Sequence, residues 1–358
     1  MSDAQAPARP EVVARREGTL GHITLNRPAA YNALTLGMVR AIAAALEAWE
    51  HDPHVAVLLI DGAGDRAFCA GGDIRALYEA ARAGRHDDLA AFFREEYRLN
   101  GRLARFPKPI VAVMDGMTMG GGIGLGAHAA HRVVTERSIL AMPEVKIGFA
   151  PDVGGTYLLS RAPGELGVHL ALTGGRLGAA DALACGLADA HVPTAHLHDL
   201  RIALARCRGD AEIRACLAEL GRPPEPGHFA AARPWIDRCY RGDTAEEILD
   251  ALRAAPEPDA RAAAAEIAGN APTSVKVSLQ ALRDARRLDL EDCLDAEFRV
   301  SCSITRSPDF VEGVRAAVVD KDRSPRWRPA RLSEVGRQDV LRHFAPTPFG
   351  ELGLGAGR

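Results

Sequence analysis

Two acidic residues, Glu144 and Asp152, lie in the segment MPEVKIGFAPDVGG, which begins at Met142 and is otherwise largely apolar. Prolines and a pair of glycines break this segment into turns. An acid in such a turn commonly caps a helix or forms the turn itself. A carboxylate held in apolar surroundings can instead act as a general base, a general acid or a nucleophile, because burial shifts its pKa. The pair is therefore a candidate catalytic site.

Two glycine-rich loops are the second chemical feature of the chain. The loops are AFCAGGDI (67–74) and GMTMGGGIGLG (116–126), and each follows an apolar run typical of a buried strand. Glycine lets the backbone approach a ligand closely. Backbone N–H groups at such turns can bind an oxyanion, and each donor is worth roughly 3 kcal/mol in acyl transfer. A tight turn without chemistry is the simpler interpretation of either loop taken alone.

The second loop also fits a dinucleotide-binding pattern. Gly122, Gly124 and Ala127 match the form G-x-G-x-x-A, and Glu144 follows at about the spacing of the acid that binds a ribose. This interpretation requires the loop early in a βαβ unit, whereas in this chain it follows a late strand. It also leaves the first glycine loop unexplained, so we do not favour it.

The elements that would position these residues alternate between strand and helix. Residues 11–26 read as a hairpin, and buried strands are predicted at 55–61, 109–115 and 132–135. Between the hairpin and the strand at 55–61, Thr35 can cap a helix that has apolar residues on one face. This order favours an α/β core. Beyond residue 201 the pattern becomes mainly helical.

We therefore expect four parts along the chain. They are a disordered leader (1–10), an α/β core (11–205), a helical C-terminal region (206–330) and an irregular tail (331–358).

Composition excludes several classes of function. The formal net charge is -3 without a long block of one sign, so neither nucleic acid nor a membrane surface is an expected partner. The opening residues lack a signal peptide, and the 7 cysteines are scattered as in a cytoplasmic protein with reduced thiols. His128 and His131 are spaced like a metal-binding pair, but without a third ligand nearby we expect no metal. Cys69 is interpreted as an apolar filler and Asp73 as a helix cap.

Several motifs together resemble the crotonase (enoyl-CoA hydratase/isomerase) superfamily. They are AFCAGGDIR, FFREEYRLN, KPIVAVMDGMTMGGGIGLGAH and AMPEVKIGFAPDVGGTYLL. The second and fourth more narrowly resemble its 3-hydroxyisobutyryl-CoA hydrolase branch, and the resemblance extends over about residues 12–330. It implies a spiral of ββα units with a C-terminal helical region, acyl-CoA lying across the core, and homo-oligomers such as trimers.

The resemblance also implies roles for individual residues. The thioester oxygen would lie between the backbone N–H groups of Gly72 and Gly121. Glu144 would be the main catalytic carboxylate, either attacking the thioester carbonyl or activating water against it. Asp152 and Glu96 would hold the hydroxyl group of the substrate. Glu96 could alternatively lie on a solvated helix face, beside two arginines.

One departure from the hydratases indicates the reaction. Hydratases carry a first catalytic Glu three residues after the oxyanion glycine, where this chain has Gly124. Hydration of a double bond needs two matched groups, so this departure argues against a hydratase. The resemblance to the hydrolase branch implies instead thioester hydrolysis of 3-hydroxyisobutyryl-CoA and related short 3-hydroxyacyl-CoAs, a step of valine breakdown. Coenzyme A is part of this substrate, and no separate cofactor is expected. The alternatives are an enoyl-CoA isomerase or hydratase and a non-catalytic acyl-CoA-binding protein.

Overall fold

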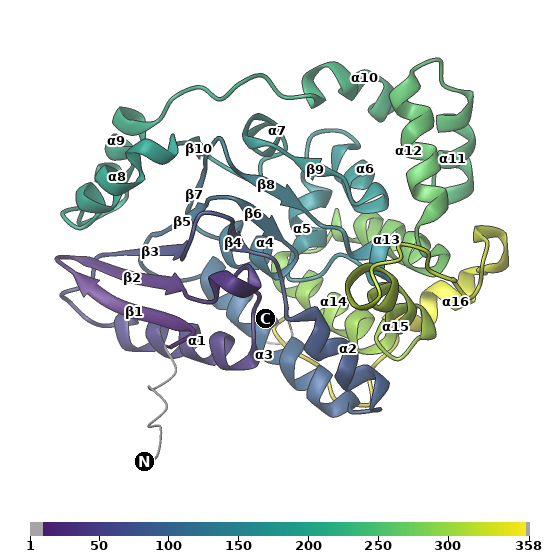
Figure 1. Cartoon of the computed structure of the whole chain (residues 1–358), viewed down its shortest axis with the longest axis horizontal. Helices are drawn as coiled ribbons and strands as arrows, with labels where there is room; N and C mark the ends of the chain where they lie inside the picture. Colours follow the sequence, from purple (N-terminus) through teal and green to yellow (C-terminus); the bar gives the residue numbers. More distant parts are fainter. Residues whose placement is uncertain (1–9, 356–358) are drawn as a thin grey trace, which may run out of the picture.

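Two β-sheets form the centre of the molecule, and helices surround them (Figure 1). The computed structural model describes residues 10–355, so the expected leader lies outside the described residues except for Pro10. The first sheet has the strand order β1 (Val12–Glu17), β2 (Leu20–Leu25), β3 (Val57–Gly62), β5 (Ile110–Met114), β7 (His131–Val134) and β10 (Ala190–His191). The second sheet has the order β4 (Ala67–Cys69), β6 (Met117–Met119), β8 (Ile139–Ala141) and β9 (Arg176–Leu177).

The chain passes repeatedly from the first sheet to the second. It runs from β3 to β4, from β5 to β6 and from β7 to β8, and each pass adds one parallel strand to both sheets. Helices follow each pass, so the chain winds as a spiral of ββα units. This arrangement confirms the predicted α/β fold class.

Local sequence chemistry accounts for the first elements. The hairpin expected at 11–26 is the antiparallel pair β1 and β2. Helix α1 (Leu36–Glu50) begins after Thr35, whose side chain accepts a hydrogen bond from the N–H of Met38, and its apolar face is buried. A capping box formed by Thr244 and Glu247 likewise starts α11 (Ala245–Ala254). The hairpin and α1 form as predicted because their signals are local.

The remaining helices lie around the two sheets and beyond them, and the short 3-10 and π-helical turns among them carry the label η. In chain order they are η1 (Pro28–Ala30), α2 (Ile74–Arg82), α3 (His86–Ala104), α4 (Gly121–Gly126), η2 (Glu144–Ile147), α5 (Gly155–Ser160), α6 (Leu166–Thr173), α7 (Ala179–Ala184), η3 (Thr194–His196), α8 (Leu197–Leu204), α9 (Asp210–Leu220), α10 (Phe229–Cys239), α11 (Ala245–Ala254), α12 (Pro258–Gly269), α13 (Pro272–Ala285), α14 (Leu290–Ile304), α15 (Pro308–Val314), η4 (Arg315–Val319), η5 (Leu332–Glu334), α16 (Arg337–Leu341) and η6 (Arg342–Phe344).

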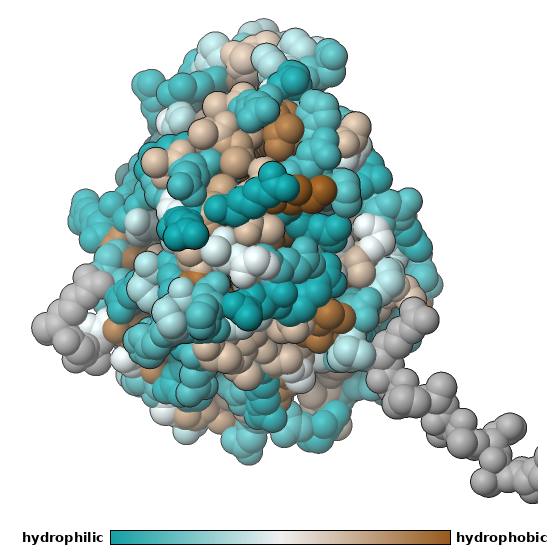
Figure 2. All heavy atoms as spheres, turned by 90° about the vertical axis from the view of Figure 1, so that its left-hand side faces the viewer, coloured by the Kyte–Doolittle hydropathy of each residue, from teal (hydrophilic) through white to brown (hydrophobic). Residues whose placement is uncertain are grey.

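Helices α8 and α9 cover the outer face of the first sheet. Leu200 and Leu204 of α8 and Ile213 of α9 pack against sheet residues such as Leu59 and Val113. Figure 2 shows the side of the molecule that lies at the left of Figure 1, where apolar residues are scattered among hydrophilic ones. Among residues 10–355, no helix is long and apolar enough to cross a membrane.

The last described residues lie along α3 and α14. Arg94 of α3 donates hydrogen bonds to the carbonyls of Phe349, Gly350 and Glu351. Asp295 of α14 accepts hydrogen bonds from the N–H groups of residues 354 and 355. Leu352 is buried between these attachments. The segment that the sequence presents as an irregular tail thus holds two helices together, and the domain boundaries themselves stay predictions.

Candidate active site

All five residues that the sequence singles out for catalysis or substrate binding line one cavity of about 200 Å³. These residues are Gly72, Glu96, Gly121, Glu144 and Asp152. The topology explains why segments so far apart in sequence meet. The loops that bear Gly72, Gly121 and Glu144 follow β4, β6 and β8, and these three strands are parallel neighbours in the second sheet. Their carboxyl ends therefore reach the same edge of the sheet.

The two glycine loops touch each other at this edge. A Cβ atom placed on Gly121 would lie 3.3 Å from the backbone nitrogen of Gly72 and 2.6 Å from Glu96 Oε1. Gly71 and Gly120 have positive φ angles of 98° and 47°, which favour glycine. Helix α4 begins at Gly121, so the N–H groups of its first turn have no partner within the helix. The contact between the loops explains why both are rich in glycine.

Glu144 opens the short helix η2 and lies against the second glycine loop. Its Oε1 atom is 2.9 Å from the position of a Cβ on Gly120, and its Oε2 atom has no hydrogen-bond partner among the described residues. The side chain is buried. Burial raises the pKa of Glu144 well above its usual value, and the charge of Asp152 raises it further. A carboxylate with a raised pKa is a stronger base once it has lost its proton.

Asp152 is held by a hydrogen bond from α3. The hydroxyl of Tyr97 donates to Asp152 Oδ2 at 2.6 Å, and the same hydroxyl lies 2.6 Å from Ser301 Oγ. Burial raises the pKa of Asp152 to about 7, although the bond from Tyr97 lowers it. At Asp152 the effect of burial on the pKa is thus partly offset by the hydrogen bond from Tyr97.

Glu96 is buried and faces the cavity, so the alternative of a solvated helix face is wrong. Only 2% of its surface is exposed, and its Oε1 atom has no hydrogen-bond partner in the described part of the chain. Burial and, secondarily, the charge of Asp152 raise the pKa of Glu96 well above its usual value. Its neighbour Arg94 points instead to the last residues of the chain.

Apolar side chains make up most of the remaining cavity wall. They are Ile74, Leu77, Phe92, Phe93, Met119, Ile147, Phe149 and Val318. Apolar walls keep the local dielectric low, which strengthens the interaction between backbone dipoles and a developing negative charge. The cavity therefore combines backbone donors, three carboxyl groups and an apolar pocket for a short chain.

No side chain fits at position 124, where a hydratase would carry its first catalytic Glu. A Cβ atom on Gly124 would lie 2.6 Å from the Cβ of Val153 and 2.8 Å from Asn100 Nδ2. Real Cβ atoms essentially never approach neighbours this closely. Glu144 thus has no catalytic partner at position 124.

The enoyl-CoA hydratase/isomerase family model matches residues 20–344 of the chain. The chain belongs to this family. Family membership agrees with the spiral of ββα units and with the cavity at the ends of β4, β6 and β8. The resemblance inferred from the glycine loops and from the motifs FFREEYRLN and AMPEVKIGFAPDVGGTYLL is therefore confirmed.

Curated relatives and solved structures add detail within the family. The chain is 42% identical over 343 residues to the protein named 3-hydroxyisobutyryl-CoA hydrolase, mitochondrial, of Rattus norvegicus, and the match covers 93% of this chain and 88% of the relative. The Homo sapiens protein of the same name is 41% identical over 344 residues, with 94% and 89% covered. A crystal structure described as a carnitinyl-CoA dehydratase from Mycobacterium thermoresistibile has a TM-score of 0.92 and 47% identity, with 98% and 100% covered. Another, described as an enoyl-CoA hydratase from Rhodobacter sphaeroides 2.4.1, has a TM-score of 0.89 and 44% identity, with 96% and 99% covered.

Other candidate residues from the sequence have structural contacts. His128 Nε2 lies 2.8 Å from the carbonyl oxygen of Val153, and burial lowers the pKa of this histidine to about 4. His131 pairs with Asp210. Across residues 10–355 no group of three or more His, Cys, Asp or Glu residues could hold a metal ion.

Cys69 and Asp73 of the first glycine loop also behave as the sequence suggests. Cys69 is buried, and burial raises the pKa of its thiol to about 12, so it is not a reactive thiolate. Asp73 caps α2 by accepting a hydrogen bond from the N–H of Ala76.

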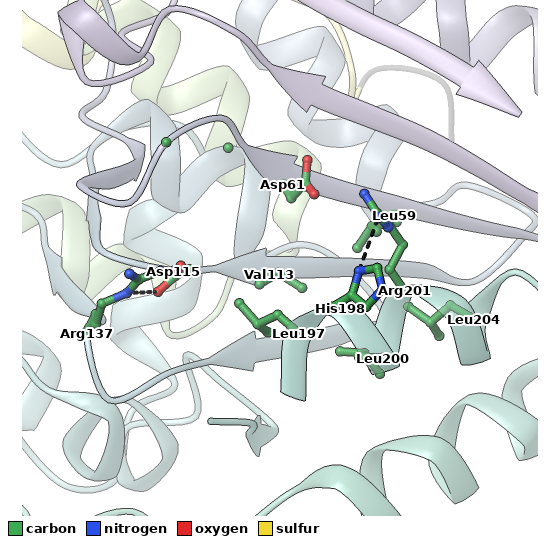
Figure 3. Close-up of a pocket in the computed structure, with 12 residues that line it drawn as sticks. Leu59, Asp61, Val113, Asp115, Arg137, Leu197, His198, Leu200, Arg201 and Leu204 are labelled. Carbon is green, nitrogen blue, oxygen red and sulfur yellow. Dashed lines mark hydrogen bonds and ion pairs between the residues drawn. The ribbon is translucent and has the colours of Figure 1, made fainter. Parts of the chain in front are cut away.

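A second cavity, of about 300 Å³, lies between α8 and the strands β3 and β5 (Figure 3). None of the sequence-predicted site residues lines it. Its charged groups have partners, since Asp115 pairs with Arg137 and Asp61 with His22. Figure 3 also shows His198 and Arg201 of α8 pointing toward each other on its wall. One carboxyl oxygen in its lining, Asp61 Oδ1, has no hydrogen-bond partner among the described residues, but this cavity holds neither the glycine loops nor the three carboxyl groups of the first one.

Sequence reasoning missed two residues that organise the site. Tyr97 directly follows Glu96 in the motif FFREEYRLN, so its position in that motif was an available signal. Glu297 of α14 accepts hydrogen bonds from the loop after Asp152, yet it lies far along the chain in an ordinary amphipathic helix. No spacing pattern could have indicated Glu297, because only the packing of α14 brings it to the loop.

Proposed function

We propose that this chain hydrolyses the thioester of 3-hydroxyisobutyryl-CoA, and of related short 3-hydroxyacyl-CoAs, to the free hydroxy acid and CoA. The names of the similar vertebrate proteins support this substrate. The observation that carries the reaction type is the environment of Glu144. This carboxyl group lies against the glycine loop, while the place of the first hydratase Glu, at Gly124, is closed by Val153.

The thioester carbonyl would bind with its oxygen between the N–H groups of Gly72 and Gly121. Negative charge develops on this oxygen when a nucleophile adds to the carbonyl carbon. Two fixed donors stabilise that charge without reorganising, and removal of one such donor typically lowers kcat by about 10²–10³-fold. The apolar walls exclude water from the rest of the acyl group.

Glu144 would then drive the addition by one of two routes. As a general base it takes a proton from water, hydroxide adds to the carbonyl carbon, and the C–S bond breaks as the proton passes to the sulfur of CoA. As a nucleophile it adds directly, the C–S bond breaks to leave an acyl-Glu144 anhydride, and water then cleaves the anhydride. Hydroxylamine trapping followed by peptide mass spectrometry distinguishes the routes, because only the anhydride yields a hydroxamate on Glu144.

Asp152 and Glu96 would select the hydroxylated acyl group. Both carboxyl groups line the cavity, and Asp152 is fixed by Tyr97. A buried carboxylate that accepts a hydrogen bond from the substrate hydroxyl holds the acyl group in one orientation. Substrates without the hydroxyl leave the carboxylate unpaired, which costs about 1–3 kcal/mol.

A thiol-release assay over a panel of CoA thioesters tests the proposal. We expect CoA release from 3-hydroxyisobutyryl-CoA, weaker release from isobutyryl-CoA, and none from crotonyl-CoA beyond background. An isomerase or hydratase would convert the unsaturated substrate without liberating thiol. Absence of thiol release from every hydroxylated thioester would exclude the hydrolase.

The variant Glu144→Gln should lower kcat by at least about 100-fold, because the amide is neither base nor nucleophile. Binding of the CoA thioester should persist, which also separates an enzyme from a non-catalytic binding protein. Glu95→Gln is the matched control, because Glu95 lies in the FFREEYRLN motif but pairs with Arg40 near the surface. Equal activity of the Glu144 variant and wild type would contradict the assigned role.

The remaining expectations from the sequence belong to this proposal. Hydrolysis transfers no electrons, and the substrate brings its own CoA, so we expect activity without an added cofactor, also after dialysis against a chelator. The oligomeric state is measured by light scattering during gel filtration. The cytoplasmic location stays a prediction, since the similar vertebrate hydrolases are named mitochondrial.

A further inference from the structure

We propose that Glu297 is a positioning residue, which holds the turn after Asp152 in a strained shape so that the Asp152 carboxylate meets the substrate hydroxyl. The inference rests on the proposed hydrolase function. The sequence indicated a turn at the glycine pair after Asp152 but gave no sign of Glu297.

The turn contains an unusual backbone conformation. Val153 has a φ angle of 55°, in the left-handed region that β-branched residues rarely adopt. A non-glycine residue in a sparsely populated region costs on the order of 1–3 kcal/mol and persists only where its surroundings over-determine it. Such strain is concentrated at functional sites, and Val153 directly follows Asp152.

Glu297 accepts three hydrogen bonds from this turn. Its Oε2 atom accepts a hydrogen bond from the N–H of Gly154 at 2.6 Å. Its Oε1 atom accepts from the N–H of Thr156 at 2.9 Å and from Thr156 Oγ1 at 2.5 Å. On the other side of the turn, His128 lies 2.8 Å from the carbonyl oxygen of Val153. The turn is thus held from both sides.

The geometry requires a carboxylate at position 297. Both oxygens face backbone N–H donors, so an amide side chain would place its NH₂ group against one of them whichever way it was turned. Glu297 is only 3% exposed, so water cannot replace the lost bond easily. The variant Glu297→Gln therefore releases the turn on one side while it preserves the volume of the side chain.

The first readout is the discrimination between 3-hydroxyisobutyryl-CoA and isobutyryl-CoA. Because Asp152 acts on the hydroxyl, Glu297→Gln should lower kcat/KM for the hydroxylated substrate by about tenfold or more and for isobutyryl-CoA by much less. If Glu297 had a merely structural role, kcat/KM would fall equally for both substrates. That result would overturn the inference. If wild-type protein released no thiol from either thioester, the proposed function itself would fail instead.

The second readout is a rescue experiment at Val153. Glycine adopts a positive φ angle about as readily as a negative one, so Val153→Gly should restore much of the discrimination to Glu297→Gln. Val153→Ala removes nearly the same side-chain volume but keeps the backbone penalty, so it should not rescue. Equal rescue by alanine and glycine would refute strain as the mechanism.

Two further variants control for folding and for charge. Glu291→Gln removes another buried carboxylate of α14, one paired with Arg105, and should lower thermal stability without changing the discrimination. If Glu297→Gln does not fold, Thr156→Val removes one of the three bonds and should reduce the discrimination by a smaller factor. An acidic shift of the pH profile with an unchanged plateau would indicate that Glu297 acts through its charge, and would overturn the positioning role.

Discussion

The oxyanion site is tested most directly by adding a methyl group to each of its two glycines. At Gly121 the new Cβ would lie 2.6 Å from Glu96 Oε1, 3.1 Å from Leu34 Cδ1 and 3.3 Å from the nitrogen of Gly72. At Gly72 the nearest atoms are those of the Phe92 ring at 3.4 Å and Leu77 Cδ1 at 3.5 Å, which are ordinary contacts. The same methyl group therefore displaces atoms at one position and fits at the other.

The expected magnitudes follow from these distances. In Gly121→Ala, either the Glu96 carboxyl or the N–H groups of the two loops must move. Misplacement of reacting groups by about 1 Å costs roughly 10²-fold, and loss of one oxyanion donor costs about 10²–10³-fold. We expect kcat/KM to fall by about 100-fold or more in Gly121→Ala. In Gly72→Ala it should fall by about tenfold at most, since a tolerated change of packing costs less than about 1.5 kcal/mol.

The assay is CoA release from 3-hydroxyisobutyryl-CoA, with thermal unfolding of both variants measured alongside. Overpacking costs about 1–3 kcal/mol, so Gly121→Ala should remain folded at room temperature, and its loss of activity is then a loss of catalysis. If Gly121→Ala retains most of the activity, the assignment of the Gly121 N–H as an oxyanion donor is wrong. If both variants lose activity equally, the difference expected from the Cβ contacts is refuted.

Two further predictions concern pH and stability. In the proposed mechanism Glu144 must lose its proton to react, so kcat/KM should rise with pH through the raised pKa of Glu144. The charge of Asp152 contributes to raising that pKa, so in Asp152→Asn the midpoint of the pH–rate profile should move to lower pH. A shift of the midpoint to higher pH would contradict the coupling between the two carboxyl groups. Leu352 is buried, so Leu352→Ala should lower the free energy of unfolding, measured in urea, by about 2 kcal/mol or more. The control Leu341→Ala alters a residue that is 36% exposed and should change the free energy of unfolding little. Equal effects of the two variants would show that the last residues are not docked as described.

The parts of the fold that the sequence predicted depend on local chemistry. The hairpin, the Thr35 cap and the buried strands arise from residues close together in the chain, so short patterns suffice. The site residues were named by the resemblance to the crotonase superfamily, and the topology explains why they lie together. Gly72, Gly121 and Glu144 lie just after parallel strands, and parallel neighbours bring such loops to one edge. Recognising the motifs therefore indicated the cavity as well as its members.

The parts that escaped prediction depend on contacts between distant elements. The Glu297 carboxylate reaches the turn at Gly154 only because α14 packs beside α3 and α5. The last residues looked irregular because proline, arginine and glycine give no periodic pattern, yet Arg94 and Asp295 hold them by their backbone. A pattern search cannot detect such attachments, because the partners are backbone atoms rather than residue types.

Val153 connects the two features that distinguish this site from a hydratase. Its side chain occupies the space beside Gly124, so a carboxylate cannot stand there. Its backbone, with a φ angle of 55°, belongs to the turn that carries Asp152 in the cavity. A chain that adopts this turn thus has no room for the first hydratase Glu and carries instead Asp152, the carboxyl group proposed to bind the substrate hydroxyl. With Glu144 as the proposed reacting carboxylate beside the two glycine loops, the site is better suited to addition to the thioester carbonyl than to addition to a double bond.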